Sequence, residues 1–299
     1  MGVVGRILIL LLVGACGGAS VAHAAAGPAG SELVEFAGIG LASGQQLQGA
    51  LFRPDGDGPF PAIVAMHGCG GLIQAHGGMF SRDLGWAREL REEGFIVLFI
   101  DSFRSRGFVG GCNTNGEGPP VHPWSERPRD AYAGLLYLQA RPDVMPDRIG
   151  LIGWSHGGAS VMFTVAADDS ARPRSLPHGD FRAAVAFYPG WCRPGRIPPS
   201  WAPAMPLLVL MGAADDWVTP AACAQVTEAA AKAGAPVQTV LYPGAFHDFD
   251  GNDPVRTITL YEGHHAHGVS VGMNPEAKAD AFRRVGAFFA QYLGSGRPR

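Results

Sequence analysis

The sequence has few charged residues, no run of Lys or Arg and no Cys-x-x-Cys pair. Charged residues make up 16% of its 299 positions, and the formal net charge is −3. The lack of basic runs argues against nucleic acid as a partner. The lack of Cys-x-x-Cys removes the usual signal of a zinc site or a thioredoxin-like motif. Because 47% of the residues are hydrophobic, the chain can still bury a large core.

The first 24 residues have the pattern of a signal peptide. Arg6 precedes an apolar run at residues 7–13, which is too short to span a bilayer, and Ala22-His23-Ala24 forms an A-x-A cleavage site. Cleavage there leaves residues 25–299 and changes the net charge from −3 to −4, because Arg6 is the charged residue removed. We therefore expect export, to the periplasm or the medium. The alternative is a lipobox at residues 13–16, which would leave Cys16 lipidated.

Strand and helix patterns alternate along the rest of the chain. Alternating apolar and polar residues predict an antiparallel edge hairpin at residues 32–39 and 45–53. Apolar runs typical of buried strands follow at residues 61–66, 95–101, 149–153, 181–188 and 206–211, and a last strand is predicted at residues 237–242. Helices are predicted at residues 80–93, 129–139, 159–167, 220–233 and 275–292. This order predicts a single α/β domain whose mostly parallel sheet, of about eight strands, has helices on both faces.

Two irregular insertions, at residues 107–128 and 251–274, follow the carboxyl ends of strands. Sheets of this class place their sites at that edge, so we expect both insertions to shape the entrance of a pocket.

The cysteines beyond the leader suggest disulfides. An even number in an oxidising compartment is typical of disulfide-bonded proteins, and four cysteines allow three connectivities. If the third and fourth strands are neighbours, and the sixth and seventh likewise, then Cys69–Cys112 and Cys192–Cys223 are the easiest pairs. The alternative is four buried thiols.

A serine between glycines follows the strand at residues 149–153. Gly153-Trp154-Ser155-His156-Gly157 is a G-x-S-x-G sequence, the pattern of a nucleophile elbow. A strand that turns at once into a helix crowds the backbone, which requires glycines on both sides of the serine. The serine is then exposed at a helix N-terminus, which favours developing negative charge. We predict that Ser155 is a nucleophile; an ordinary glycine-rich turn is the alternative.

An acid and a histidine follow Ser155 in the order that this nucleophile requires. A serine hydroxyl needs a base to take its proton and a carboxylate to orient that base. Asp215 follows the strand at residues 206–211, and His247 follows the strand at residues 237–242. Both are therefore predicted at carboxyl ends of strands, beside Ser155.

Each of the two partners has competitors. Asp216 is farther from the end of its strand than Asp215 and is expected to be solvated. His264, His265 and His267 lie in the polar insertion and are expected to face solvent. No carboxylate or cysteine at ligand spacing supports a metal site there, so no metal is predicted.

The oxyanion of a tetrahedral intermediate needs two donors. His156, the residue after the nucleophile, is predicted to supply one backbone N–H, with its imidazole incidental. The loop His67-Gly68-Cys69-Gly70-Gly71 is rich in glycine, and the Cys69 N–H is the second candidate. Cys69 as a thiol nucleophile is the alternative, but it has no elbow around it.

Taken together, these landmarks resemble the dienelactone hydrolase family of α/β-hydrolases over residues 45–293. The likeness rests on an ordered set of motifs: H-G-x-x-G-L from His67, Asp101-Ser102-Phe103 with Arg104 and Arg106, G-W-S-x-G-G from Gly153, Phe187-Tyr188-Pro189-Gly190, G-x-x-D-x-x-V from Gly212, and His247-x-Phe249. The resemblance implies the α/β-hydrolase fold. It also implies that Arg104 or Arg106 binds a substrate carboxylate, with solvated loop arginines as the alternative.

Two positions depart from that family. Dienelactone hydrolases proper use a cysteine nucleophile and a glutamate in the loop after the third strand, where this chain has Ser155 and Gly68. The departure argues against a dienelactone substrate and favours a Ser-His-Asp esterase that acts on a small-molecule ester.

The residues therefore predict an exported serine esterase that needs no cofactor. Three tryptophans, Trp154, Trp191 and Trp217, are candidates for lining an apolar pocket, although buried tryptophans are commonly core. One alternative is an exported serine peptidase of the prolyl-oligopeptidase type, against which the lack of a preceding propeller-sized domain counts. The other is a non-catalytic binding protein on a hydrolase scaffold.

Overall fold

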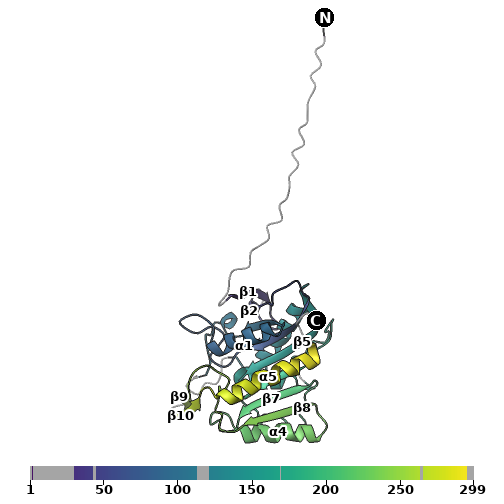
Figure 1. The fold of residues 1–299 in the computed structure, drawn as a ribbon. Helices are drawn as coiled ribbons and strands as arrows, with labels where there is room; N and C mark the ends of the chain where they lie inside the picture. The colour runs from purple at the N-terminus through teal and green to yellow at the C-terminus, as the bar shows by residue number, and fades with distance from the viewer. Residues whose placement is uncertain are drawn as a thin grey trace.

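An eight-stranded sheet forms the centre of the protein in the computed structural model (Figure 1). The structure describes residues 2, 30–42, 45–112, 121–168, 170–262 and 265–294. Apart from residue 2, the predicted signal peptide lies outside these ranges, and so does Cys16. The strands lie in the order β1-β2-β4-β3-β5-β6-β7-β8. Their bounds are β1 (Glu32–Ala37), β2 (Gln46–Phe52), β3 (Phe60–Met66), β4 (Ile96–Asp101), β5 (Val144–Trp154), β6 (Ala184–Phe187), β7 (Leu207–Gly212) and β8 (Val237–Tyr242).

The sheet is parallel from β4 to β8, and the pairs β1–β2 and β2–β4 are antiparallel. Every residue of β3, β4, β6 and β7 is buried, as their continuous apolar runs predict for strands covered on both faces. The edge strand β1 instead alternates between covered and exposed positions. The prediction of a mostly parallel sheet with an antiparallel edge hairpin is confirmed.

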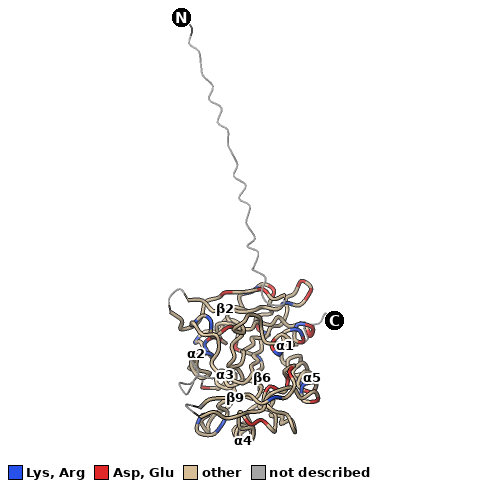
Figure 2. Tube along the Cα trace, turned by 90° about the vertical axis from the view of Figure 1, so that its left-hand side faces the viewer, with Lys and Arg blue, Asp and Glu red and all other residues tan. Residues whose placement is uncertain are grey.

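Helices cover both faces of this sheet. They are α1 (Ser81–Glu92), α2 (Glu126–Gln139), α3 (His156–Thr164), α4 (Pro220–Lys232) and α5 (Pro275–Leu293). One apolar core holds side chains of α1 and α5, which lie in front of the sheet in Figure 1, and the other holds side chains of α2, α3 and α4. Basic and acidic residues are interspersed along the helices and loops (Figure 2). Among the described residues, no helix is long and apolar enough to cross a membrane.

Helix α3 begins earlier than its sequence predicts. The predicted helix starts at Ala159, whereas the observed helix begins at His156 and includes Gly157 and Gly158, which have low helix propensity. Tertiary contact overrides propensity here, since the turn must occur directly after the strand. For α2 the start is Glu126 instead of the predicted Arg129.

The insertion at residues 251–274 is a regular hairpin and not an irregular loop. β9 (Arg256–Glu262) and β10 (His265–Val271) pair antiparallel and form a sheet of their own. Leu260, Val269 and Val271 are buried against Trp217. The segment that was predicted to be irregular therefore has side chains on one face of two strands, and these build a small apolar core. The hairpin also contacts the loop after β8, because the N–H of Gly272, just after β10, donates to the His247 carbonyl at 2.9 Å.

Two disulfides cross-link segments that follow the carboxyl ends of β3, β4, β6 and β7. Cys69 pairs with Cys112 and Cys192 pairs with Cys223, as predicted. The premise of that prediction also holds, since β3 and β4 are neighbours, and so are β6 and β7. Two disulfides fit an oxidising environment.

Candidate active site

A sharp turn between β5 and α3 presents Ser155 above the sheet edge. The serine has φ 53° and ψ −110°, a conformation that costs energy for a residue with a side chain. A Cβ on Gly153 would lie 2.4 Å from the Gly157 carbonyl oxygen, and a Cβ on Gly157 would lie 1.9 Å from the Met66 oxygen. Backbone therefore occupies the space on both sides of the turn, as the crowding argument requires.

Asp215 and His247 meet Ser155 at this edge. His247 Nε2 lies 3.0 Å from Ser155 Oγ, and His247 Nδ1 lies 2.8 Å from Asp215 Oδ2. The other carboxylate oxygen, Asp215 Oδ1, accepts the backbone N–H groups of Trp217 at 2.9 Å and Val218 at 3.0 Å. These bonds fix the Asp215 carboxylate. The carboxylate can then hold a proton on His247 Nδ1, which leaves His247 Nε2 free to accept the serine proton.

The competing residues lie elsewhere. Asp216 is exposed, and its Oδ1 accepts the Ser270 N–H at 2.8 Å, so it anchors β10 instead of being free in solvent. His265 and His267 are exposed on β10, and His264 lies outside the described residues. In the ranges that the structure covers, no three His, Cys, Asp or Glu residues are grouped so that they could hold a metal ion.

Cys69 and His156, the two predicted oxyanion donors, lie near Ser155, because all three residues line one cavity. His156 is the first residue of α3, and the first amides of a helix have no partner within it. Cys69 lies in the loop after β3, and its carbonyl accepts the Gly111 N–H at 2.7 Å. Gly111 and Cys112 come from the insertion after β4, so this insertion supports the loop that carries the Cys69 amide.

Tyr188 and Asp250 lie beneath His247, and sequence reasoning missed both. The Tyr188 ring packs on the His247 imidazole with centroids 4.4 Å apart. Asp250 is 1% exposed and accepts three hydrogen bonds, from Tyr188 Oη at 2.6 Å, Trp86 Nε1 at 2.6 Å and Trp154 Nε1 at 2.8 Å. Burial raises the pKa of the Asp250 carboxyl, while the Arg82 guanidinium opposes the shift. The available signal was Asp250 itself, an acid three residues after His247 and directly after the apolar Phe249.

Backbone strain is concentrated around the site. Among the described residues, the non-glycine positions with positive φ are Ser155, Tyr188, Trp191 and Asp248. All four lie at or next to the hydrogen-bonded group of Ser155, His247 and Asp215, or line a cavity beside it. Such strain persists only where the surrounding structure enforces it, which is typical of functional sites.

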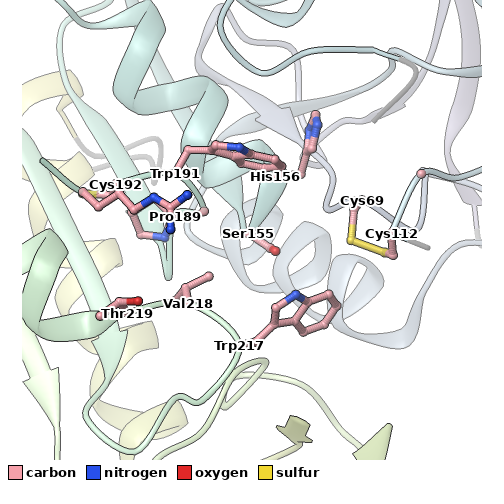
Figure 3. A pocket seen from close by; sticks show the side chains of 13 residues that line it. Cys69, Cys112, Ser155, His156, Pro189, Trp191, Cys192, Trp217, Val218 and Thr219 are labelled. Atoms are coloured by element: carbon pink, nitrogen blue, oxygen red, sulfur yellow. A yellow bond between two sulfur atoms is a disulfide. The ribbon is translucent and has the colours of Figure 1, made fainter. Parts of the chain in front are cut away.

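Two cavities open beside the Ser155 hydroxyl. One has a volume of about 250 Å³ and is lined by residues that include Trp191, Pro189 and Arg193. The other has a volume of about 450 Å³ and includes His247. Figure 3 shows the first, with Ser155 between the Trp191 and Trp217 side chains and the Cys69–Cys112 disulfide to one side. Both predicted insertions contribute lining residues, as expected.

Of the predicted binding residues, Trp191 and Trp217 line these cavities and the other three do not. Trp154 is fully buried, with its indole bonded to Asp250, so it belongs to the core. Arg106 forms two bonds to the buried Asp130 carboxylate, at 2.8 and 2.9 Å. Arg104 lies on the surface, 3.7 Å from Asp101. Their predicted role as carboxylate binders is therefore corrected, because Arg106 is occupied by an internal acid and Arg104 is outside both cavities.

The His156 imidazole is also not incidental. It is 1% exposed, and its Nδ1 lies 2.8 Å from Nη1 of the buried Arg127. Burial lowers the pKa of His156 well below its usual value, and the neighbouring Arg127 charge lowers it further. Arg127 was predicted to lie in a loop, and only its position in α2 brings it to this site.

Comparison with known proteins shows which family and which proteins this chain is similar to. The Dienelactone hydrolase family matches residues 47–293. A Bacillus subtilis protein named "Putative hydrolase YtaP" is 32% identical over 127 residues, which span 38% of this chain and 41% of that protein. A Synechocystis protein named "Putative carboxymethylenebutenolidase" is 24% identical over 272 residues, which span 83% of this chain and 93% of that protein. The match therefore covers less than half the length of the first of these relatives.

Among solved structures, an esterase of Thermogutta terrifontis with bound propionate has a TM-score of 0.62 and 18% identity. The alignment covers 91% of this chain and 97% of the esterase. At this identity the likeness shows a shared fold.

Proposed function

The chain belongs to the dienelactone hydrolase family. Starting from this membership and from the geometry around Ser155, we propose that it is a serine esterase that cleaves small carboxylic esters through an acyl-enzyme. The observation that carries the proposal is the continuous hydrogen-bonded series from Ser155 Oγ through His247 to Asp215, with contacts of 3.0 and 2.8 Å. The family is one of hydrolases, and the chemistry that fits this series is attack of an activated serine on a carbonyl carbon.

In the proposed reaction, His247 Nε2 takes the proton of Ser155 as Oγ attacks the ester carbonyl. Asp215 holds the Nδ1 proton and stabilises the imidazolium that forms. The carbonyl oxygen becomes an oxyanion that accepts the backbone N–H groups of Cys69 and His156. His247 then gives its proton to the departing alkoxide. A water molecule, activated by the same imidazole, hydrolyses the acyl-serine.

The two cavities suggest which part of the ester lies on which side. The leaving alcohol must lie near His247, which protonates it, and the cavity that includes this residue is the larger, at about 450 Å³. The acyl group is then assigned to the cavity beside Trp191, of about 250 Å³. We expect kcat/KM for aryl esters to fall as the acyl chain lengthens from acetyl to octanoyl, and Trp191→Ala to reduce that fall.

An active-site probe tests the proposal directly. A fluorophosphonate should label Ser155, as located by mass mapping, and hydrolysis of a short-chain aryl ester should vanish in Ser155→Ala. Ser160→Ala is the matched control, because Ser160 is buried one turn further along α3 and donates only to the His156 carbonyl, at 2.8 Å. A folded wild-type protein that neither reacts with the probe nor hydrolyses the ester would refute the enzyme assignment and favour a binding protein. Faster cleavage of peptide amides than of esters would favour the peptidase.

We also propose that the protein is exported. The leader pattern at residues 1–24 and the two disulfides support this. Mass spectrometry of the mature chain should find Ala25 as its first residue. Lipidated Cys16 would instead support a membrane-anchored form, and an uncleaved chain with reduced cysteines would contradict export.

A further inference from the structure

Arg127, in the first turn of α2, is a buried arginine without an acidic partner. Its side chain is 0% exposed, and no carboxylate of the described chain lies within ion-pair distance of it. The nearby Asp130 carboxylate is instead occupied by both terminal nitrogens of Arg106. A buried charge without a counterion destabilises the fold. Retaining one next to an active site therefore calls for an explanation beyond stability.

The guanidinium joins two segments that flank Ser155. Arg127 Nη1 donates to the His67 carbonyl at 2.8 Å and to His156 Nδ1 at 2.8 Å. His67 directly precedes Gly68 and Cys69 in the loop after β3, and His156 opens α3. One nitrogen atom thus connects the loop that carries the Cys69 amide with the turn that carries the His156 amide.

Both histidines are neutral in this arrangement. His67 Nδ1 donates to the Gly68 carbonyl at 2.6 Å, and its Nε2 accepts the Ser102 N–H at 3.3 Å, which accounts for a single ring proton. His156 Nδ1 accepts from Arg127, so its proton is on Nε2. Burial lowers the pKa of both rings well below the usual value. Arg127 is therefore the positive charge of this cluster.

We propose that Arg127 is the positioning residue of the oxyanion hole: it fixes the separation of the Cys69 and His156 amides and holds a positive charge behind them. This inference rests on the proposed esterase function. Donors that are fixed before the reaction need no reorganisation when the oxyanion forms, and a charge in a site without water acts on it strongly. Arg127 itself does not touch the substrate. Its loss should therefore slow the chemical step and leave substrate binding largely unchanged.

The test compares variants with wild-type protein whose Ser155-dependent esterase activity has been measured first, so failure of the function and failure of this inference are separate results. In Arg127→Gln we expect kcat to fall about 10- to 100-fold, somewhat less than the loss of a direct oxyanion donor, with KM changed less than about twofold. The Ki of an aryl trifluoromethyl ketone, which forms an oxyanion on Ser155, should rise by the same factor as kcat falls. Arg127→Lys, which keeps the charge, should recover part of the loss.

Arg141→Gln is the control for losing a guanidinium that lies away from the site. Arg141 follows α2, binds Asp143 and lies outside both cavities, so this variant should lower the melting temperature and leave kcat unchanged. His156→Phe removes only the ring acceptor of the bridge and keeps the backbone amide. It should also lower kcat, and adding it to Arg127→Gln should cost little more, because both remove one interaction.

A folded Arg127→Gln protein with kcat and ketone affinity within about twofold of wild type would overturn the inference. If Arg127→Gln does not fold, His156→Phe decides: a wild-type kcat in that variant rejects the bridge, and a loss of kcat matched by weaker ketone binding supports it.

Discussion

The buried carboxyl of Asp250 offers a test of how the base of the site is held together. It is the shared acceptor of two indole N–H groups and one phenol O–H, all within 2.8 Å. Replacing it with Leu, of similar shape, leaves the two buried indole N–H groups without a partner and the Tyr188 hydroxyl with only its 3.4 Å contact to Asp248 Oδ1. An unpaired buried donor costs about 1–3 kcal/mol, so the two indoles alone give a gross loss of about 2–6 kcal/mol. Removing a carboxyl whose pKa burial has raised offsets part of this.

We therefore expect Asp250→Leu to lower the free energy of unfolding by about 4 kcal/mol, a large share of the 5–15 kcal/mol typical of a domain. Asp250→Asn should cost only about 1 kcal/mol. Its amide oxygen can still accept from Trp86 and Trp154, and its amide N–H can donate to the Tyr188 hydroxyl, which is able to reverse its role. Indole N–H groups have no such freedom, because they only donate.

Urea unfolding, followed by tryptophan fluorescence, measures both values. Asp253→Leu is the control, since Asp253 pairs with Arg256 at the surface, where both side chains are about half exposed, and such pairs contribute little. If Asp250→Leu lies within about 1 kcal/mol of wild type, or if Asp250→Asn is as damaging as Asp250→Leu, the reasoning from unpaired donors is wrong.

Three further predictions follow from the cross-links, the buried histidines and the elbow. Serine substitution of Cys192 and Cys223 removes a disulfide of sequence separation 31 and should cost about 3–4 kcal/mol of stability, with kcat retained. Serine substitution of Cys69 and Cys112 should lower kcat as well. Equal kcat in the two variants would contradict the role of the Cys69 loop. Below pH 6.5 the unfolded chain takes up protons that the buried, neutral His156 does not, so its contribution to stability is present above that pH and is lost as pH falls. In His156→Gln, the slope of stability against pH between 6.5 and 5 should therefore decrease, by up to about 1.4 kcal/mol per pH unit, and an unchanged slope would refute this. Gly157→Ala should abolish activity and reduce soluble yield, because its Cβ would lie 1.9 Å from the Met66 oxygen; an active, stable variant would disprove the close contact.

Much of the fold could be predicted because its signals are local. Continuous apolar runs identified the buried strands, and alternation identified the edge hairpin, because each pattern reflects the faces that a short segment covers. Glycines around Ser155, and an acid and a histidine after later strands, could be found in the same way. Strand neighbours then allowed the disulfide pairs to be predicted.

The sequence by itself determined the order of strands and helices and the chain positions of Ser155, Asp215 and His247. Tertiary structure alone decided which tryptophan is core and which lines a cavity, that Arg106 binds Asp130, and that Arg127 reaches His156 across 29 positions of sequence. The physical reason is that periodicity records which face of a segment is buried, but not what it is buried against. A buried charge is recognisable only when the groups that surround it, brought together by packing of α2 on the sheet, are known.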